Sequence, residues 1–414
     1  MHGRFLAVLT VVVVAAAALT GSTLVVRLAY VLAAVLVVAA TLSWTAVRWV
    51  DIERTTRARR AEVGGLAEES FVVANRSWLP KLWLEVLDAS DLPGHHASRV
   101  VSALAPGQSR SWSVRTPCGR RGLYTLGPVT LAGGDPLGMF RVERELAATT
   151  PFVIYPRTYP LRAVDLPTGY LSGGQVVRRR AQYTTTNVRG VRGYQPGDAF
   201  NRIHWPTTAR RGRLFTKEFE LDPIADFWVI VDLDREAQAG EVELPPAEGV
   251  AVPWLGETHE ALDPTTEEYG VSVAASLARY FLDQGKSVGL IAHGQRRVVV
   301  QPDRGERQLG KVLANLAVLR AVGRASLARV LSAESHQFTR HTTLVVVTPT
   351  TAMRWIDQLR ELRYRGVASL VVLVEASTFG PAGSSLGAVS ALAAHAIPSR
   401  LVKRGDDIPS TLGA

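Results

Sequence analysis

The side chains most able to do chemistry gather in one stretch, from Thr185 to Glu220. Its charged and aromatic members include Arg189, Arg192, Arg202, Arg210, Arg211, Arg213, Lys217, Asp198, Glu218, Glu220, Tyr194 and Trp205. Arginine clusters bind carboxylates and phosphates, or they pair with acids of the same chain. Because acids and aromatic residues lie among these cations, we expect an internally paired ionic cluster in place of a solvated face.

A turn at Pro196-Gly197-Asp198 is expected to organise this cluster. Proline fixes φ at one central position and glycine accepts a positive φ at the next. The turn should therefore point Asp198 back towards the nearby arginines. Thr207 or Thr208 is expected to cap a short helix that leads into Arg210.

An enzyme built on the cluster would use it as an anion or phosphate site. The candidate bases and nucleophiles nearby are His204, Thr207 and Thr208, with Asp198 to orient them. Because no serine or cysteine partner is evident, a structural hydrogen bond is favoured for His204 over general-base chemistry. A hydrolase-like or anion-binding enzyme is thus the alternative, and no catalytic residue is assigned.

A second acidic group, formed by Asp232, Asp234 and Glu236, follows the apolar run from Phe227 to Val231. Alternate carboxylates at the end of a strand can bind Mg²⁺ or Ca²⁺. The simpler interpretation is an acid-rich helix start, which the helix dipole favours.

The composition favours a membrane protein over a nucleic-acid-binding one. The 414 residues carry 47 Lys and Arg against 37 Asp and Glu, a net charge of +10. No zinc-finger spacing or RNA-binding aromatic pattern is present, so we expect no specific nucleic acid. Nucleic-acid or lipid binding through Arg178–Arg180 and Arg210–Arg213 is a third hypothesis. The single cysteine, Cys118, excludes an internal disulfide framework.

Residues 1–50 predict a transmembrane hairpin. Phe5–Leu19 and Leu28–Val47 are apolar runs, each close to the about 20 residues that cross a bilayer. A signal peptide is the alternative for the first run, and the second would still anchor the chain. The positive-inside rule places the body of the protein in the cytoplasm, because five arginines follow the second run: Arg48, Arg54, Arg57, Arg59 and Arg60.

Three further regions follow the hairpin. Residues 61–157 show short apolar runs separated by Pro, Gly, Asn and Asp, which is typical of a β-sandwich-like domain. Residues 158–220 predict a loop-rich basic linker that contains the charged cluster. Residues 221–414 alternate apolar strands with helical segments and predict a doubly wound α/β domain with a parallel sheet. The functional edge of that sheet should lie near Asp232 and Thr348.

The ordered residues of the cluster resemble the core motif of the domain of unknown function 58 family. Elements at 121–128 and 135–138 are similar to the family's RGxYxLGP and DPxG elements. The resemblance implies two membrane spans, a β domain and a von Willebrand factor A-like α/β domain. The core positions are Arg192-Gly193-Tyr194, Pro196-Gly197-Asp198, Arg202-Ile203-His204-Trp205, Thr208-Ala209-Arg210 and Lys217-Glu218.

The resemblance also implies a partner. Members of the family are often encoded with a MoxR-type AAA+ ATPase and are thought to act as adaptors. Many von Willebrand A domains bind a divalent ion through D-x-S-x-S. Here Asp232-Leu233-Asp234-Arg235-Glu236 has acids where the serines belong, and Thr348-Pro349-Thr350 lacks the expected Asp.

We therefore expect a non-enzymatic interaction protein that is anchored in the cell membrane by two spans and faces the cytoplasm. In this interpretation an AAA+ ATPase docks on the α/β domain and the charged cluster. Arg192, Asp198, Arg202 and Arg210 are expected to hold the cluster together by ion pairing. Tyr194, Gly197, Trp205, Lys217 and Glu218 complete the interaction motif, and Asp232, Asp234 and Glu236 are the candidate metal ligands.

Overall fold

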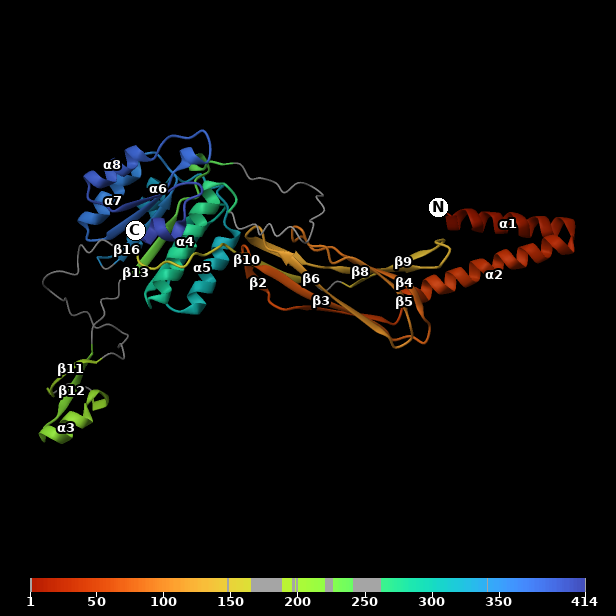
Figure 1. Cartoon of the computed structure of the whole chain (residues 1–414), viewed down its shortest axis with the longest axis horizontal. Helices are drawn as coiled ribbons and strands as arrows, with labels where there is room; N and C mark the ends of the chain where they lie inside the picture. Colours follow the sequence, from red (N-terminus) through yellow and green to blue (C-terminus); the bar gives the residue numbers. More distant parts are fainter. Residues whose placement is uncertain are drawn as a thin grey trace. The chain divides into compact units, whose positions relative to one another are not determined.

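A computed structural model describes residues 2–146, 149–164, 188–195, 198, 200–219, 226–240, 262–340 and 342–413. The chain forms two compact units (Figure 1). Unit 1 comprises residues 1–158, 242–264 and 313–319. Unit 2 comprises residues 159–241, 265–312 and 320–414.

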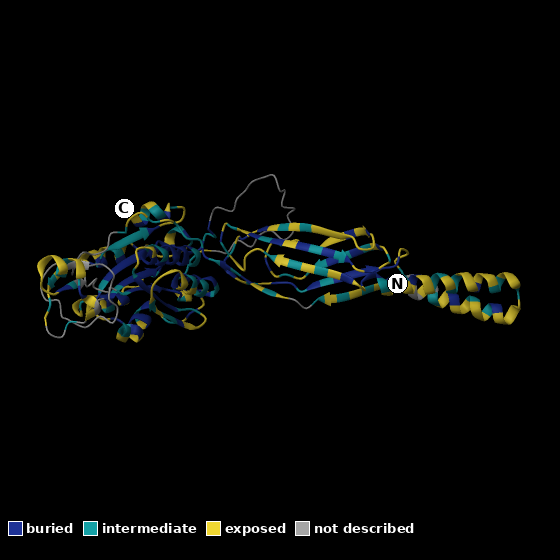
Figure 2. Ribbon diagram, turned by 90° about the horizontal axis from the view of Figure 1, so that it is seen from below, coloured by how far each residue is buried: buried dark blue, intermediate teal, exposed yellow. Residues whose placement is uncertain are grey.

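Unit 1 begins with two antiparallel helices, α1 (His2–Thr20) and α2 (Thr23–Ala46) (Figure 1). Gly21, at φ +59°, allows the sharp reversal between them. Of the described helices, α2 is the one long and apolar enough to cross a membrane; the apolar part of the first helix, Ala7–Thr20, is shorter. Side chains along the pair are mostly exposed (Figure 2). By length and composition α2 is one possible membrane span, and the second span stays a prediction.

The rest of unit 1 is built from three sheets with strand orders β1-β3-β6, β5-β4-β8-β9 and β2-β10-β7. The first two sheets share one core, in which Phe71 and Val73 of β3 meet Leu84 and Val86 of β4. The strands are β1 (Val50–Thr56), β2 (Arg60–Glu62), β3 (Leu66–Asn75), β4 (Lys81–Asp88), β5 (Arg99–Leu104), β6 (Ser109–Pro117), β7 (Gly122–Leu126), β8 (Val129–Gly134), β9 (Arg141–Leu146) and β10 (Thr150–Tyr155).

The strands begin earlier than residue 61, where the sequence predicted the β domain to start. Val50–Thr56 pairs antiparallel with β3, and Arg60–Glu62 pairs parallel with β10. These residues were expected to form the basic flank of the membrane span, because charged residues outnumber apolar ones in them.

Arg121, in the RGxYxLGP element, has a structural role within unit 1. Its side chain is fully buried and donates to the carbonyl oxygens of Leu316, at 3.1 Å, and Leu319, at 2.8 Å. These carbonyls lie at the C-terminal end of α5 (Glu306–Val318), where backbone acceptors lack helical partners and a cation is favoured.

Unit 2 contains a six-stranded sheet in the order β15-β14-β13-β16-β17-β18. Neighbouring strands are parallel except for β15, which is antiparallel at the edge. This confirms the predicted parallel sheet. The strands are β13 (Asp226–Val231), β14 (Ser287–His293), β15 (Arg297–Asp303), β16 (Thr342–Thr348), β17 (Ala368–Val374) and β18 (Ser399–Val402).

Helices cover both faces of this sheet, because its central strands are apolar on both sides. Phe227 stacks on Phe281 of α4 (Thr266–Asp283), with ring centroids 4.3 Å apart. On the other face Trp228 and Ile230 share a core with three helices: α6 (Leu327–Glu334), α7 (Arg354–Tyr364) and α8 (Leu386–Ala394). A last short helix, α9 (Ile408–Gly413), follows β18.

The predicted linker 158–220 contains a small folded element in its described part. Strands β11 (Val188–Gly193) and β12 (Phe215–Phe219) pair antiparallel, and between them lie η1 (Phe200–Arg202) and α3 (Trp205–Arg211). We call residues 188–219 the hairpin module. Neither strand is predicted from the sequence, because glycines and arginines take most positions of β11.

Candidate functional site

The hairpin module is organised by a two-bond contact between Arg192 and Asp198. Arg192 donates from Nη1 to Asp198 Oδ2 at 2.8 Å and from Nη2 to Oδ1 at 2.7 Å. The backbone N–H of Gln195 and the hydroxyl of Thr216 also donate to Oδ2, at 3.0 and 3.3 Å. These donors, Arg192 foremost, lower the pKa of Asp198 to about 2. Asp198 therefore turns back to an arginine, as its sequence position predicts.

This pair is half-buried, with 40% of the Arg192 side chain and 17% of the Asp198 side chain exposed. The predicted internally paired cluster is therefore smaller than expected. No described residue forms an ion pair with Arg210, Arg211 or Arg213, and all three are exposed. Arg213 instead lies over the ring of Phe215, 5.4 Å from its centroid.

The short helix α3 is capped by His204, not by the predicted Thr207 or Thr208. His204 Nδ1 accepts from the backbone N–H of Thr207 at 3.3 Å and lies 2.8 Å from its hydroxyl. The helix starts earlier than predicted because Pro206 occupies its first turn, where proline is favoured. The Nδ1 of His204 is thus engaged in a structural contact.

Two large aromatic side chains of the module face solvent. Phe200 is 71% exposed and Trp205 is 62% exposed. Phe200 is held by Tyr194, whose ring centroid lies 6.1 Å away. We call the exposed set Phe200, Trp205, Arg210, Arg211 and Arg213 the basic-aromatic face.

The remaining motif residues differ in exposure, and some lie outside the described residues. Arg202 is exposed at the end of η1, and Lys217 is half-buried in β12. Glu218 is a residue of strand β12, and its side chain is not among the parts of the chain that the structure describes. Gly197 and Glu220 are outside the described residues. The backbone N–H of Asp198 donates to the carbonyl oxygen of Gln195 at 3.0 Å, which is the hydrogen bond that closes a four-residue turn at the predicted place.

A second polar group lies at the carboxyl edge of the unit 2 sheet, where β13 and β16 end side by side. The Thr348 hydroxyl donates to Asp232 Oδ2 at 2.6 Å, and the backbone N–H of Asp234 donates to Oδ1 at 3.1 Å. The sequence therefore placed Asp232 and Thr348 at the correct edge. Glu375, which follows the neighbouring β17, was missed; it is 4% exposed and accepts from the Ser385 backbone N–H at 3.0 Å.

The three candidate metal ligands do not converge. Asp234 turns away to cap η2 (Arg235–Ala237) by accepting from the Glu236 backbone N–H at 3.3 Å. Within the described ranges no group of three His, Cys, Asp or Glu residues is arranged to hold an ion. Asp234 thus matches the alternative interpretation, an acid at a helix start, and Mg²⁺ or Ca²⁺ binding stays a prediction.

Replacing Asp232 with asparagine is expected to stabilise unit 2. Burial raises the pKa of this carboxyl from 3.8 to about 6. Folding therefore favours the protonated form, and the charged form costs stability once the pH rises through 6. A pKa shift of about two units corresponds to about 3 kcal/mol of unfolding free energy. The gain in stability should be smaller than this, because asparagine reproduces the contacts with Thr348 and Asp234 imperfectly.

Thermal unfolding in EDTA at about pH 7.5 should give a higher Tm for Asp232→Asn, with the difference vanishing near pH 4. The exposed Glu236→Gln is the matched control and should leave the Tm unchanged. A lower Tm for Asp232→Asn at neutral pH would contradict the prediction. A rise of the wild-type Tm with Mg²⁺ or Ca²⁺ that Asp232→Asn abolishes would support the metal interpretation.

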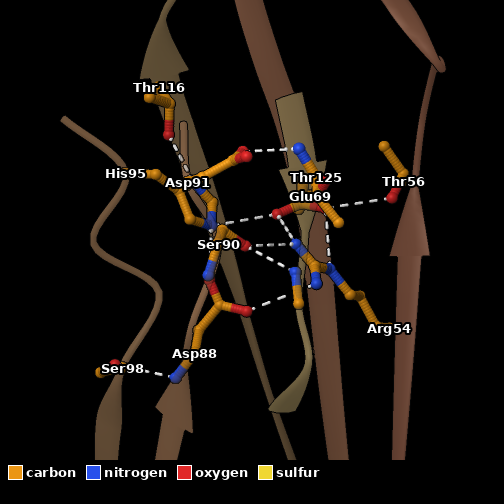
Figure 3. Close-up of polar contacts among 11 residues, drawn as sticks. Arg54, Thr56, Glu69, Asp88, Ser90, Asp91, His95, Ser98, Thr116 and Thr125 are labelled. Atoms are coloured by element: carbon orange, nitrogen blue, oxygen red, sulfur yellow. Dashed lines mark hydrogen bonds and ion pairs between the residues drawn. The ribbon is translucent and has the colours of Figure 1, made fainter. Parts of the chain in front are cut away.

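A third polar group, which the sequence analysis missed, lies inside unit 1 (Figure 3). Arg54 donates to both carboxylate oxygens of Glu69, at 2.9 and 2.8 Å, and lies 3.3 Å from Asp88. His95 Nε2 lies between the carboxylates of Glu69, at 3.1 Å, and Asp88, at 3.2 Å. No more than 10% of any of these four side chains is exposed.

These four residues, the Arg54–His95 network, form a neutral group of two cations and two anions. Burial opposes the charge on His95, but Asp88 and Glu69 outweigh it and raise the pKa of His95 to about 9. The alternation of buried and exposed residues in β3 could have predicted this network from the sequence. Glu69 alternates in phase with the buried Ala67 and Phe71, so an acid at this position needs a buried partner.

Comparison with known proteins supports the family resemblance. A model of the family described as "Protein of unknown function DUF58" matches residues 190–252, which include most of the hairpin module. The uncharacterized protein YeaD of Bacillus subtilis (strain 168) is 25% identical over 202 residues. The match covers 48% of this chain and 43% of that relative, so the chain spans less than half of its length.

Similarities to solved structures are weak. The CARDB domain of the PF1109 protein from Pyrococcus furiosus, in complex with di-metal ions, is 15% identical with a TM-score of 0.19, covering 25% of this chain and 91% of that one. The alkylpurine DNA glycosylase AlkC of Pseudomonas fluorescens is 16% identical with a TM-score of 0.18, covering 26% and 30%. TM-scores this low assign neither fold nor function.

Proposed function

We propose that this chain is a membrane-anchored, cytoplasmic interaction protein that docks a partner on the basic-aromatic face of its hairpin module. The observation that carries the proposal is the exposure of Phe200 and Trp205 in the same short module as three exposed arginines that have no acidic partner among the described residues. Aromatic and arginine side chains are the residues that contribute most to protein–protein binding energy. An acidic, partly apolar protein surface is the complementary partner.

The rest of the architecture supports this role. One apolar helix is long enough to anchor the chain, and the arginines at 48–60 favour a cytoplasmic body by the positive-inside rule. Two of the three sheets of unit 1 share one core, an arrangement that is compatible with a β-sandwich. The strand order of unit 2, with one antiparallel edge strand, is compatible with a von Willebrand factor A-like domain. On the strength of the family resemblance, the partner we propose is a MoxR-type AAA+ ATPase.

We assign the module no catalytic role. The sequence from 188 to 219 contains no serine or cysteine. His204, its one histidine, has Nδ1 engaged at the start of α3. Asp198, with a pKa lowered to about 2, remains an anion bound to Arg192 and is a poor proton acceptor.

Reversing one charge on the face should release the partner. Arg211→Glu is expected to reduce several-fold the recovery of the ATPase in a crosslinking pull-down from membranes, because the new carboxylate repels an acidic surface. Arg329→Glu, on α6, is the matched control, since Arg329 is also an exposed helical arginine. Equal recovery with both variants, or turnover of a hydrolase substrate that Asp198→Ala and His204→Ala both abolish, would overturn the proposal.

A further inference from the structure

The end of α2 contacts the β strands of unit 1 directly, and no long linker separates them. Residues 47–49 alone separate α2 from β1. Lys81 is 3% exposed and donates from Nζ to the carbonyl oxygen of Thr45 at 2.6 Å. Arg144 donates to the carbonyl oxygens of Val47 and Val50, at 3.3 and 2.8 Å. The buried Lys81 and the partly buried Arg144 thus satisfy acceptors at the C-terminal end of the helix and in the residues that follow it, where positive charge is favoured.

The last turns of α2 also pack against the β8–β9 turn. The hydroxyl of Ser43, which is 1% exposed, donates to Asp135 Oδ1 at 3.3 Å. Gly133 favours this close approach, because a Cβ there would lie only 3.0 Å from the Cβ of Ala46. The end of the helix and the strands are therefore joined by direct contacts, and Figure 1 shows the end of α2 meeting β4 and β9.

Large apolar side chains surround this junction and face outward. Trp78, in the loop between β3 and β4, is 80% exposed, and Leu137, in the β8–β9 turn, is 65% exposed. Trp44 and Trp49 are each 50% exposed and pack edge to face, 6.1 Å apart. The loop of Trp78 is held there, because the Arg76 backbone N–H donates to the Trp49 carbonyl oxygen at 2.8 Å. We call Trp44, Trp49, Trp78 and Leu137 the collar.

We propose that the collar lies in the headgroup region of the bilayer that α2 crosses and seats unit 1 directly on the lipid surface. This inference rests on the proposed anchoring by α2. The 24 residues of α2 extend about 36 Å at 1.5 Å per residue, whereas the hydrocarbon core is about 30 Å thick. The last turn, from Ser43, therefore reaches the headgroups, and the collar lies at the same level because it is bonded to that turn.

The chemistry of the collar matches this location. Tryptophan is enriched at membrane interfaces, where its ring is apolar and its N–H reaches water. Arg48 lies 3.9 Å over the Trp44 ring and can meet lipid phosphates. Three tryptophans and a leucine exposed around one helix end would otherwise be a costly apolar surface in water.

Site-specific fluorescence in the full-length chain tests the collar. In a Cys118→Ala background, NBD is attached through Trp78→Cys, Leu137→Cys, Val37→Cys in the middle of α2, or Leu123→Cys. Leu123 is the matched control, since it is 58% exposed on β7, in a sheet that does not join the α2 junction. Each protein is reconstituted in vesicles of phosphatidylcholine and phosphatidylglycerol, with or without doxyl-labelled lipid, and is also titrated with iodide.

We expect doxyl lipid to quench NBD at 37, 78 and 137, with shallow doxyl groups most effective at 78 and 137, and iodide to quench only at 123. Quenching by lipid at 37 but by iodide at 78 and 137 would overturn the collar and leave the anchoring intact. NBD at 78 and 137 shielded from both quenchers would overturn it in favour of a protein partner or a second copy. Exposure of position 37 to iodide would overturn the anchoring and the collar together.

Discussion

Replacing Glu69 with alanine is expected to destabilise unit 1 by about 3–5 kcal/mol, the typical loss when one partner of a buried ion pair is removed. The Glu69 side chain is fully buried and contacts both cations of the Arg54–His95 network. Without it, Arg54 and a charged His95 share the single carboxylate of Asp88, and one buried positive charge is left uncompensated.

Guanidinium titration of the full-length chain in detergent, followed by circular dichroism, should show the unit 1 transition at lower denaturant and the unit 2 transition unchanged. The neighbouring Glu68→Ala is the matched control. Glu68 pairs with Arg57, whose side chain is 79% exposed, so its loss should have little effect. Equal shifts for the two variants would show that the network is not a source of stability.

The same comparison can be made across pH. The pKa of His95 is raised from 6.5 to about 9 by Asp88 and Glu69, against the opposing effect of burial. Folding therefore favours the charged imidazolium, and this contribution is complete below about pH 6.5 and is lost as the pH rises through 9. Glu69→Ala removes one of the two acids that raise the pKa, so the alkaline loss should begin at lower pH in the variant.

The sequence predicts those parts of the fold in which a short run of residues is compatible with a single kind of structure. Phe227–Val231 is apolar throughout, and only a strand buried on both faces makes such a run stable at that length. Thr348 and Asp232 follow two such strands, so their meeting at one sheet edge was predictable. Asp198 lies six residues after Arg192, and the short turn between them brings the two together.

The missed parts depend on partners distant in the chain. Val50–Thr56 is a strand because β3 pairs with it, and Arg54 is buried there only because Glu69, fifteen positions later, supplies the charge. β11 pairs with β12 across the whole of the hairpin module, so its own residues carry a weak strand signal. Trp44 and Trp49 of the collar follow from their place at the end of the apolar run, but Trp78 and Leu137 come from two separated loops that no local pattern of the sequence brings there.

Asp135 supplies the second large effect, because it holds the turn that carries Leu137. It is 1% exposed and accepts from the backbone N–H groups of Leu137, Met139 and Phe140, at 2.9, 3.2 and 2.6 Å. Burial alone would raise its pKa, but these donors outweigh burial and lower the pKa below 3.8. Its contribution is therefore present above that pH and is lost on further acidification.

Asp135→Ala leaves three backbone donors without their charged acceptor and removes the contact with Ser43 of α2. Hydrogen bonds to a charged group contribute about 1.5–3 kcal/mol each, but water can reach part of the opened turn, so we expect a net loss of about 2–4 kcal/mol in unit 1. The denaturant titration used for Glu69→Ala measures it. Asp135→Asn, which keeps one acceptor oxygen, should lose less.

Asp135→Ala also tests whether the stability of unit 1 and the position of the collar in the bilayer can be changed independently. If Asp135 positions the collar, NBD at Leu137→Cys should become less sensitive to shallow doxyl lipid in the Asp135→Ala background, while NBD at Trp78→Cys keeps its sensitivity because its loop is bonded to Trp49. Equal loss at both positions would mean that unit 1 as a whole has come away from the bilayer. No change in either the unfolding transition or the quenching at 137 would show that Asp135 does not organise this turn.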